Sequence, residues 1–264
     1  MTYIIDGKKL AEEHRKALEA KLNNFKRKPV LVSILVGEDP ASVLYTNIKQ
    51  KKALDLGIDF LVAKFPAEAN FEIVAAEIKR LNEDTEVDGI MIQLPSIPGL
   101  VGLIKPEKDV DGLLDDSPYM AATVRAIMSI IHNERIDLSE KKVVVLGSRG
   151  EVGSRLMKVL EAQVKKIVGV DKETKDLKTV TMGADLIVSS TGHYHILKGD
   201  MVKNGVVVID VGSEKMPDGQ VCGDVEFESV APKALRWATG PEAISYRRRL
   251  LRYARNDGPL ERTE

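Results

Sequence analysis

The sequence predicts an α/β protein of two domains, each built on a parallel sheet. Its 264 residues exceed what one compact core usually needs. Apolar runs of strand length alternate with helical patterns along the chain, which is typical of βαβ units with helices covering a parallel sheet. We place the boundary near Ser117-Pro118, with a first domain over residues 1–119 and a second over residues 120–240.

The first half has recognisable helix ends. Asp39 followed by Pro40 is a typical helix start, and Gly57 is a typical stop. Pro29 ends the helical pattern that opens the chain. We expect helices over 8–25, 39–56 and 71–82 and strands over 30–37, 58–65 and 87–94.

The second half repeats the alternation and ends in a basic segment. Residues 241–256 have a helical pattern, and we expect this helix to pack back on the first domain. We further expect helices over 120–132 and 152–162 and strands over 141–147, 165–171, 184–190 and 206–210.

Composition excludes several classes of function. The chain has 39 Lys+Arg against 40 Asp+Glu, so a protein whose main task is to grip nucleic acid or anionic lipid is not expected. The single cysteine, Cys222, allows no disulfide within the chain and no Cys-rich zinc site, and it suits a cytoplasmic protein. The four scattered histidines predict no metal site. We expect neither a secretion signal nor a membrane span.

A glycine-rich turn in the second half indicates nucleotide binding. Gly147, Gly150 and Gly153 follow a predicted strand and open into a predicted helix. Glycines allow a tight turn and let backbone N–H groups approach a phosphate at a helix N-terminus. The spacing is not the usual G-x-G-x-x-G, so a turn that binds nothing is the alternative.

An acidic residue follows at a suitable distance. Asp171 ends the next predicted strand, about 24 residues after Gly147, where a carboxylate can accept a hydrogen bond from a ribose 2′-hydroxyl. The same carboxylate would repel a 2′-phosphate, whereas Arg149 or Lys172 would attract one. The choice between NAD and NADP therefore stays open at this point.

Five polar residues of the first half are candidates for chemistry. Tyr45 and Lys49 stand four residues apart on one predicted helix and share a face. Gln93 ends an apolar strand, where open α/β sheets place ligands. Asp109 and Asp111 stand in a short KDVDG turn. Each candidate also has a purely structural interpretation. Tyr45 and Lys49 would be a core aromatic and a surface lysine, Gln93 would be a capping amide, and KDVDG would be an ordinary turn.

Taken together, the segments resemble the FolD family of methylenetetrahydrofolate dehydrogenase/cyclohydrolases. The resemblance covers nearly the whole chain and follows the order of the family. In the first half it rests on PASVLYTNIKQKKALDLGI (40–58), VDGIMIQLPSIP (87–98) and KPEKDVDGL (105–113). In the second half it rests on VVVLGSRGEVG (143–153), TKDL (174–177), ADLIVSSTG (184–192) and residues 198–228.

The resemblance implies a fold, an activity and a site. It implies an N-terminal folate-site domain and a Rossmann-type domain. The implied activity is oxidation of 5,10-methylenetetrahydrofolate with NAD or NADP, followed by hydrolysis to 10-formyltetrahydrofolate, in a homodimer. Lys49 would be the catalytic lysine, with Tyr45 as its partner. Gln93 would hold that lysine, and Asp111 would bind the pterin. The implied cofactor-binding residues are Gly147, Ser148, Arg149, Gly153, Asp171, Lys172 and Ser213.

The chain departs from the family pattern at four places. Ala121–Ala126 keeps only Thr123 of the usual Pro-Cys-Thr-Pro-x-Gly, and Ser148-Arg149 reverses the usual Arg-Ser. Asp171-Lys172 replaces His-Ser, and residues 241–248 replace a glycine-rich loop. Two alternatives follow: a cyclohydrolase without dehydrogenase activity, or a non-catalytic folate- or nucleotide-binding paralogue.

Overall fold

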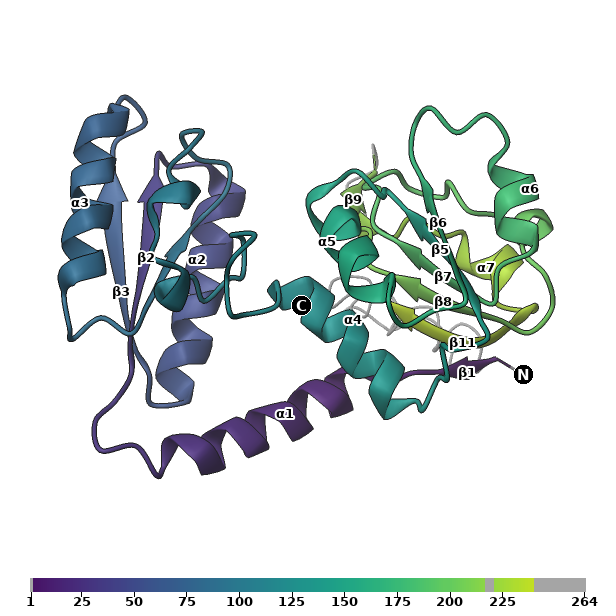
Figure 1. Cartoon of the computed structure of the whole chain (residues 1–264), viewed down its shortest axis with the longest axis horizontal. Coiled ribbons are helices and arrows are strands. Elements are labelled where there is room, and N and C mark those ends of the chain that lie inside the picture. The colour runs from purple at the N-terminus through teal and green to yellow at the C-terminus, as the bar shows by residue number, and fades with distance from the viewer. Residues whose placement is uncertain (1, 217–220, 240–264) are drawn as a thin grey trace, which may run out of the picture. The chain divides into compact units, whose positions relative to one another are not determined.

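The protein is described here by a computed structural model that covers residues 2–216 and 221–239 (Figure 1). The chain divides into two compact units. Residues 12–125 form the first unit, and the residues before 12 together with those from 126 onward form the second unit. The helices α1 (Gly7–Leu22) and α4 (Ala122–Asn133) run through the two junctions. Each unit contains a parallel sheet, as the sequence predicts.

The first unit is built on three parallel strands in the order β3-β2-β4. The connections between these strands are helical, and the elements lie within a few residues of their predicted bounds. They are β2 (Val30–Val36), α2 (Pro40–Asp55), β3 (Asp59–Phe65), α3 (Phe71–Glu83), β4 (Gly89–Ile92) and the 3-10 helices Val101–Leu103 and Pro106–Lys108.

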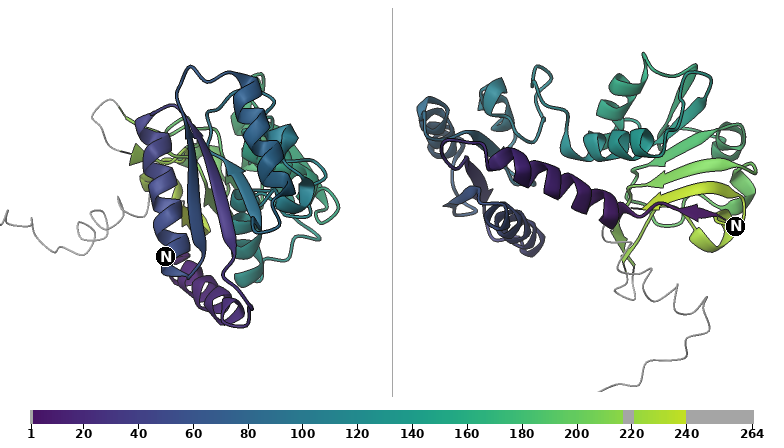
Figure 2. Two further views of the ribbon diagram at one scale, coloured as in Figure 1. Left: turned by 90° about the vertical axis from the view of Figure 1, so that its left-hand side faces the viewer. Right: turned by 90° about the horizontal axis from the view of Figure 1, so that it is seen from below.

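Different helices cover the two faces of this sheet (Figure 2). On one face, Ile78 of α3 packs with Ile34 and Ile90 of the strands, and all three are fully buried. On the other face, Ala53 of α2 packs with Met91. Burial of a large aliphatic side chain stabilises a fold by about 1.5–3 kcal/mol. These contacts hold both helices on the sheet, and α2 carries the candidates Tyr45 and Lys49.

In the described part of the second unit, six parallel strands lie in the order β1-β11-β8-β7-β5-β6. Its strands are β1 (Tyr3–Ile4), β5 (Lys142–Leu146), β6 (Lys166–Val170), β7 (Leu186–Ser189), β8 (Val206–Asp210) and β11 (Ala234–Thr239), with a separate hairpin of β9 (Glu214–Lys215) and β10 (Val221–Cys222). Its helices include α5 (Glu151–Leu160), α6 (Leu177–Met182), α7 (Phe227–Val230) and the 3-10 helix Gly199–Met201. The chain order reverses at β5, which lies between β6 and β7, so this sheet has the switch point of a Rossmann-type fold.

The N-terminus differs from the predicted domain boundaries. Tyr3 and Ile4 pair with Arg236 and Trp237, so β1 is an edge strand of the second unit rather than a part of the first (Figure 2). The backbone N–H of Ile5 continues this pairing, donating to the carbonyl of Trp237 at 2.8 Å. Without β1, the backbone of β11 would form an unpaired edge of the sheet.

The second boundary also lies later than predicted. The units divide between Arg125 and Ala126, inside α4, whereas the sequence places the division before residue 120. The predicted C-terminal helix over 241–256 lies outside the described residues, as does the segment 241–248. Within 2–216 and 221–239, no helix is both long enough and apolar enough to cross a membrane.

Candidate functional site

Lys49 and Asp111 come together in the first unit. Lys49 projects from α2, and its Nζ lies 3.5 Å from Oδ2 of Asp111. The Lys49 side chain is 38% exposed and that of Asp111 is 21% exposed, so the pair remains open to a ligand. Tyr45 lies one turn earlier on the same helix and is 42% exposed.

Asp111 is held in place by a buried neighbour. Asp109 is 1% exposed, and its Oδ2 accepts a hydrogen bond from the backbone N–H of Leu114 at 2.8 Å. A bridge between Asp109 and Ile90 fixes the turn beside β4. The KDVDG turn thus uses its first aspartate for structure and presents its second aspartate to Lys49.

Gln93 has a different local partner from the one expected. Its side chain is buried directly after β4, and Nε2 donates to the carbonyl of Leu94 at 3.1 Å. The same carbonyl accepts from Oγ of Ser42 at 3.2 Å, which ties the start of α2 to the end of β4. Among the residues that the structure describes, the buried Oε1 has no hydrogen-bond partner. A bond between Gln93 and Lys49 therefore stays a prediction, and the free acceptor is the atom that could make it.

The glycine turn of the second unit is tightly packed. Gly147 has a φ of +80°, and a Cβ on Gly153 would lie 2.1 Å from the carbonyl oxygen of Gly147. No larger residue fits at position 153 without movement of the backbone. α5 begins directly after Gly150, which has no side chain to cap the helix, and no described side chain caps it, so its first N–H groups can bind an anion.

The predicted ribose-binding carboxylate has a cationic partner. Nε of Arg149 lies 2.7 Å from Oδ2 of Asp171, and Nη1 lies 2.9 Å from Oε2 of Glu173. The hydrogen bond to Glu173 and the charge of Asp171 raise the pKa of the Arg149 guanidinium. Arg149 therefore already faces two carboxylates on the turn after β6.

The other predicted cofactor-binding residues belong to the same edge of the sheet. The backbone N–H of Ser148 donates to the carbonyl of Val170 at 3.0 Å. Lys172 is exposed in the turn after β6, and Ser213 is exposed shortly after the end of β8. This carboxyl edge is where an open α/β sheet binds its ligand. The residues present, with the cradle formed by Gly147 and Gly153, fit a dinucleotide phosphate group.

Two buried carboxylates at this edge are absent from the sequence-based prediction. Asp210 ends β8 and is 3% exposed, while Asp224 is fully buried. Burial and the neighbouring charge of Asp224 raise the pKa of Asp210 to about 7. The only signal in the sequence is an aspartate at the end of the apolar run VVVID, which resembles an ordinary solvated strand end.

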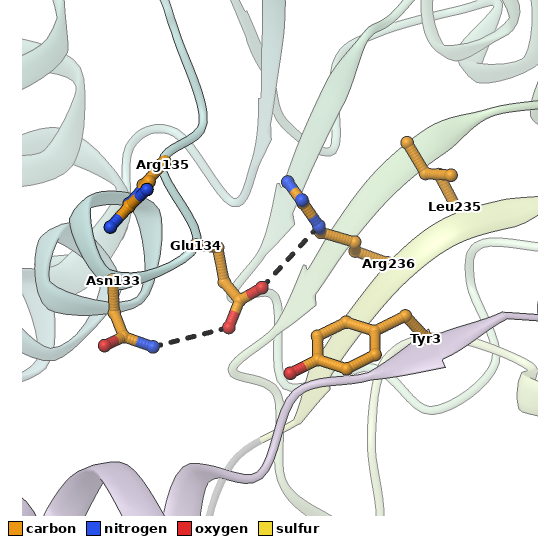
Figure 3. Close-up of a pocket in the computed structure, with 6 residues that line it drawn as sticks. All are labelled: Tyr3, Asn133, Glu134, Arg135, Leu235 and Arg236. Atoms are coloured by element: carbon orange, nitrogen blue, oxygen red, sulfur yellow. Dashed lines mark hydrogen bonds and ion pairs between the residues drawn. The ribbon is translucent and has the colours of Figure 1, made fainter.

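A hollow of the second unit lies at the opposite edge of the sheet (Figure 3). It is lined by Tyr3, Asn133, Glu134, Arg135, Leu235 and Arg236. Glu134 accepts from Nδ2 of Asn133 at 3.4 Å, and its Oε2 lies 3.6 Å from Nε of Arg236. The hollow contains no predicted site residue, and its central charges are already paired. Over the described part of the chain, no cluster of three or more His, Cys, Asp or Glu residues could hold a metal ion.

The sheet with its glycine turn places the second unit among dinucleotide-binding folds, and comparisons with known proteins identify the family. Residues 5–111 match the catalytic domain of tetrahydrofolate dehydrogenase/cyclohydrolase, and residues 121–245 match the NAD(P)-binding domain of that family. The chain is 36% identical over 251 residues to the bifunctional protein FolD of Lactobacillus gasseri, with 89% of each protein covered. The chain belongs to the tetrahydrofolate dehydrogenase/cyclohydrolase family, also called FolD.

Solved structures agree with this assignment. The bifunctional FolD enzyme of Campylobacter jejuni has a TM-score of 0.88 and 31% identity, with 92% of each chain covered. The FolD enzyme of Trypanosoma brucei, solved with NADP and an inhibitor, has a TM-score of 0.83 and 28% identity, with 91% of each chain covered. The predicted family, fold class and NAD(P)-type cofactor are therefore confirmed.

The raised pKa of Asp210 predicts a pH dependence of stability. The folded protein holds this proton to higher pH than the unfolded chain does. The carboxyl group therefore stabilises the fold fully below about pH 4 and progressively less as the pH rises through about 7. Denaturant unfolding at about pH 5 and pH 8 should show a larger loss of unfolding free energy in the wild type than in Asp210→Asn, by more than about 1 kcal/mol. Equal losses in the two proteins would contradict the prediction.

Proposed function

We propose that this protein oxidises 5,10-methylenetetrahydrofolate to 5,10-methenyltetrahydrofolate with NAD or NADP and hydrolyses the product to 10-formyltetrahydrofolate. The observation that carries the proposal is the pairing of Lys49 with Asp111 on the partly open surface of the first unit. This unit is the part of the chain that matches the family's catalytic domain. Relatives named as bifunctional FolD proteins support both activities.

Asp111 is the proposed anchor for the pterin. A pterin offers an N–H and an amino group on one edge, and a carboxylate can accept both hydrogen bonds together. A pterin bound in this way would compete with Lys49 for the same carboxylate. Binding of the substrate would then release the Lys49 amine toward the one-carbon unit.

Lys49 is the proposed acceptor of a proton in the hydrolytic step. Water that attacks the methenyl carbon must lose a proton, and a neutral amine close to that water can take it. Tyr45 lies one helical turn away and is the proposed neighbour of the substrate on the same face. The free Oε1 of Gln93 is the proposed acceptor that holds the amine in position.

The second unit is proposed to hold the dinucleotide. NAD(P), when bound, supplies the acceptor for the hydride that leaves the methylene carbon. The backbone around Gly147 and Gly153 and the uncapped start of α5 would hold its phosphates. We further propose a cytoplasmic homodimer; the state of association is tested by light scattering of the purified protein.

Replacement of Lys49 tests the hydrolytic role. Lys49→Ala should lower the rate of methenyltetrahydrofolate hydrolysis by about 10²–10⁴-fold, because the proton acceptor is lost. Loss of methenyl absorbance measures this rate. Lys51→Ala is the matched control, since Lys51 lies on the same helix and is exposed, and its rate should equal that of the wild type. A Lys49→Ala protein with the wild-type rate would remove this lysine from the mechanism.

Replacement of Asp111 tests substrate binding. Asp111→Ala should weaken the binding of folate by about tenfold or more, because the pterin edge loses its acceptor. Titration calorimetry with tetrahydrofolate measures the affinity, and a thermal melt checks folding. Asp116→Ala, an exposed neighbour, should bind as the wild type does. Equal affinities of all three proteins would refute the assignment.

The charges around Arg149 predict a preference for NAD. Asp171 and Glu173 already pair with this guanidinium, so a 2′-phosphate would meet two carboxylates. The ratio of kcat/KM for NAD over NADP should exceed one in the wild type. The double variant Asp171→Asn/Glu173→Gln should shift this ratio toward NADP by about tenfold or more. A wild type that favours NADP, or a double variant with an unchanged ratio, would reject the prediction.

A further inference from the structure

The carboxylate of Asp224 is fully buried and accepts three hydrogen bonds from described residues. Its Oδ2 accepts from Oγ of Ser189 at 2.7 Å and from the backbone N–H of Thr191 at 2.6 Å. Its Oδ1 accepts from the backbone N–H of His193 at 3.2 Å. One carboxylate therefore holds the end of β7 and the first residues of the loop that follows it.

Asp210 performs a similar task on the neighbouring segments. Its Oδ1 accepts from the backbone N–H groups of Gly212 and Asp224, each at 3.1 Å. Its Oδ2 accepts from the backbone N–H of Val225 at 3.2 Å. The two carboxylates together bind five backbone N–H groups from three separate segments of chain.

The backbone closes tightly around both carboxylates. A Cβ on Gly212 would lie 1.9 Å from Oδ1 of Asp224, and a Cβ on Gly223 would lie 2.0 Å from Oδ2 of Asp210. Glycine at both positions is required by the carboxylates themselves. Two carboxylates in one buried site repel each other, so the pair carries an electrostatic cost that a purely apolar core would avoid.

The loop held by Asp224 contacts the glycine turn. The backbone N–H and Oγ of Ser190 both donate to the carbonyl of Leu146, at 3.0 Å and 3.2 Å. A Cβ on Gly147 would lie 2.5 Å from the carbonyl oxygen of Ser190. β5 and β7 are neighbours at the switch point of the sheet, so this contact lies where a dinucleotide binds such folds.

We propose that Asp224, supported by Asp210, is a positioning residue for the dinucleotide site. It fixes the loop Thr191–His193 against the glycine turn, so that both are in place before the dinucleotide arrives. Its charge is directed into N–H groups of the protein and not toward the ligand. The inference rests on the proposed function only in requiring that the second unit binds NAD or NADP.

The test compares dinucleotide binding with folate hydrolysis in the full-length protein. Asp224→Asn keeps the shape of the side chain but places an amide NH₂ opposite an N–H donor. Its dissociation constants for NAD and NADP, measured by calorimetry, should rise by about tenfold or more. Methenyltetrahydrofolate hydrolysis uses no dinucleotide, so its rate should equal that of the wild type.

Asp185→Asn is the matched control. Asp185 also binds a backbone N–H, that of Lys142 at 2.8 Å, but it precedes β7 and so lies at the opposite edge of the same sheet. This variant should melt at a lower temperature and bind NAD and NADP as the wild type does. An Asp224→Asn protein that behaves in the same way would overturn the inference, since Asp224 would then act on stability alone.

A milder variant decides the question if Asp224→Asn does not fold. Ser189→Ala removes one hydroxyl donor to Asp224 and leaves every backbone group in place. A measurable weakening of NAD and NADP binding supports the inference, and unchanged binding overturns it. A wild type that binds neither dinucleotide also overturns it. A wild type that binds one of them but turns over no folate overturns the proposed function alone.

Discussion

The close approach of Gly153 to Gly147 is the constraint on which the second unit depends. Because no Cβ fits between them, α5 starts directly above the end of β5, with its first N–H groups uncapped. The loop after β7 then packs on the same turn through Ser190. The arrangement of these N–H groups at the start of α5 is therefore the result of backbone packing.

In the first unit, side chains and not backbone groups form the candidate site. A single helix between two strands carries both Tyr45 and Lys49, and a turn with one buried aspartate presents the other to the lysine. The start of α2 and the end of β4 share one carbonyl acceptor, that of Leu94. The residues proposed for catalysis and those proposed for nucleotide binding are thus supported by separate cores.

Elements with a strong local pattern could be predicted from the sequence, whereas pairings between distant segments could not. β2 is apolar except for Ser33, and α2 has an aspartate cap whose carboxylate accepts from the backbone N–H of Ser42 at 2.8 Å, so both were predictable. β1 and β11 were missed because two residues have no period and Arg236 interrupts the other run. Asp210 and Asp224 were missed because burial of an aspartate depends on three segments folded around it, which no local pattern reveals.

The pairing of β1 with β11 makes the second unit discontinuous in sequence. Its sheet needs residues from the start of the chain and residues near 239, while residues 12–125 form an insertion between them. During synthesis β1 leaves the ribosome before residues 12–125, and its partner β11 leaves after them. The inserted unit can therefore fold before the sheet of the second unit is complete. A change at the start of β1 would therefore affect the pairing of β1 with β11, which can form only after residues 12–125 have been made.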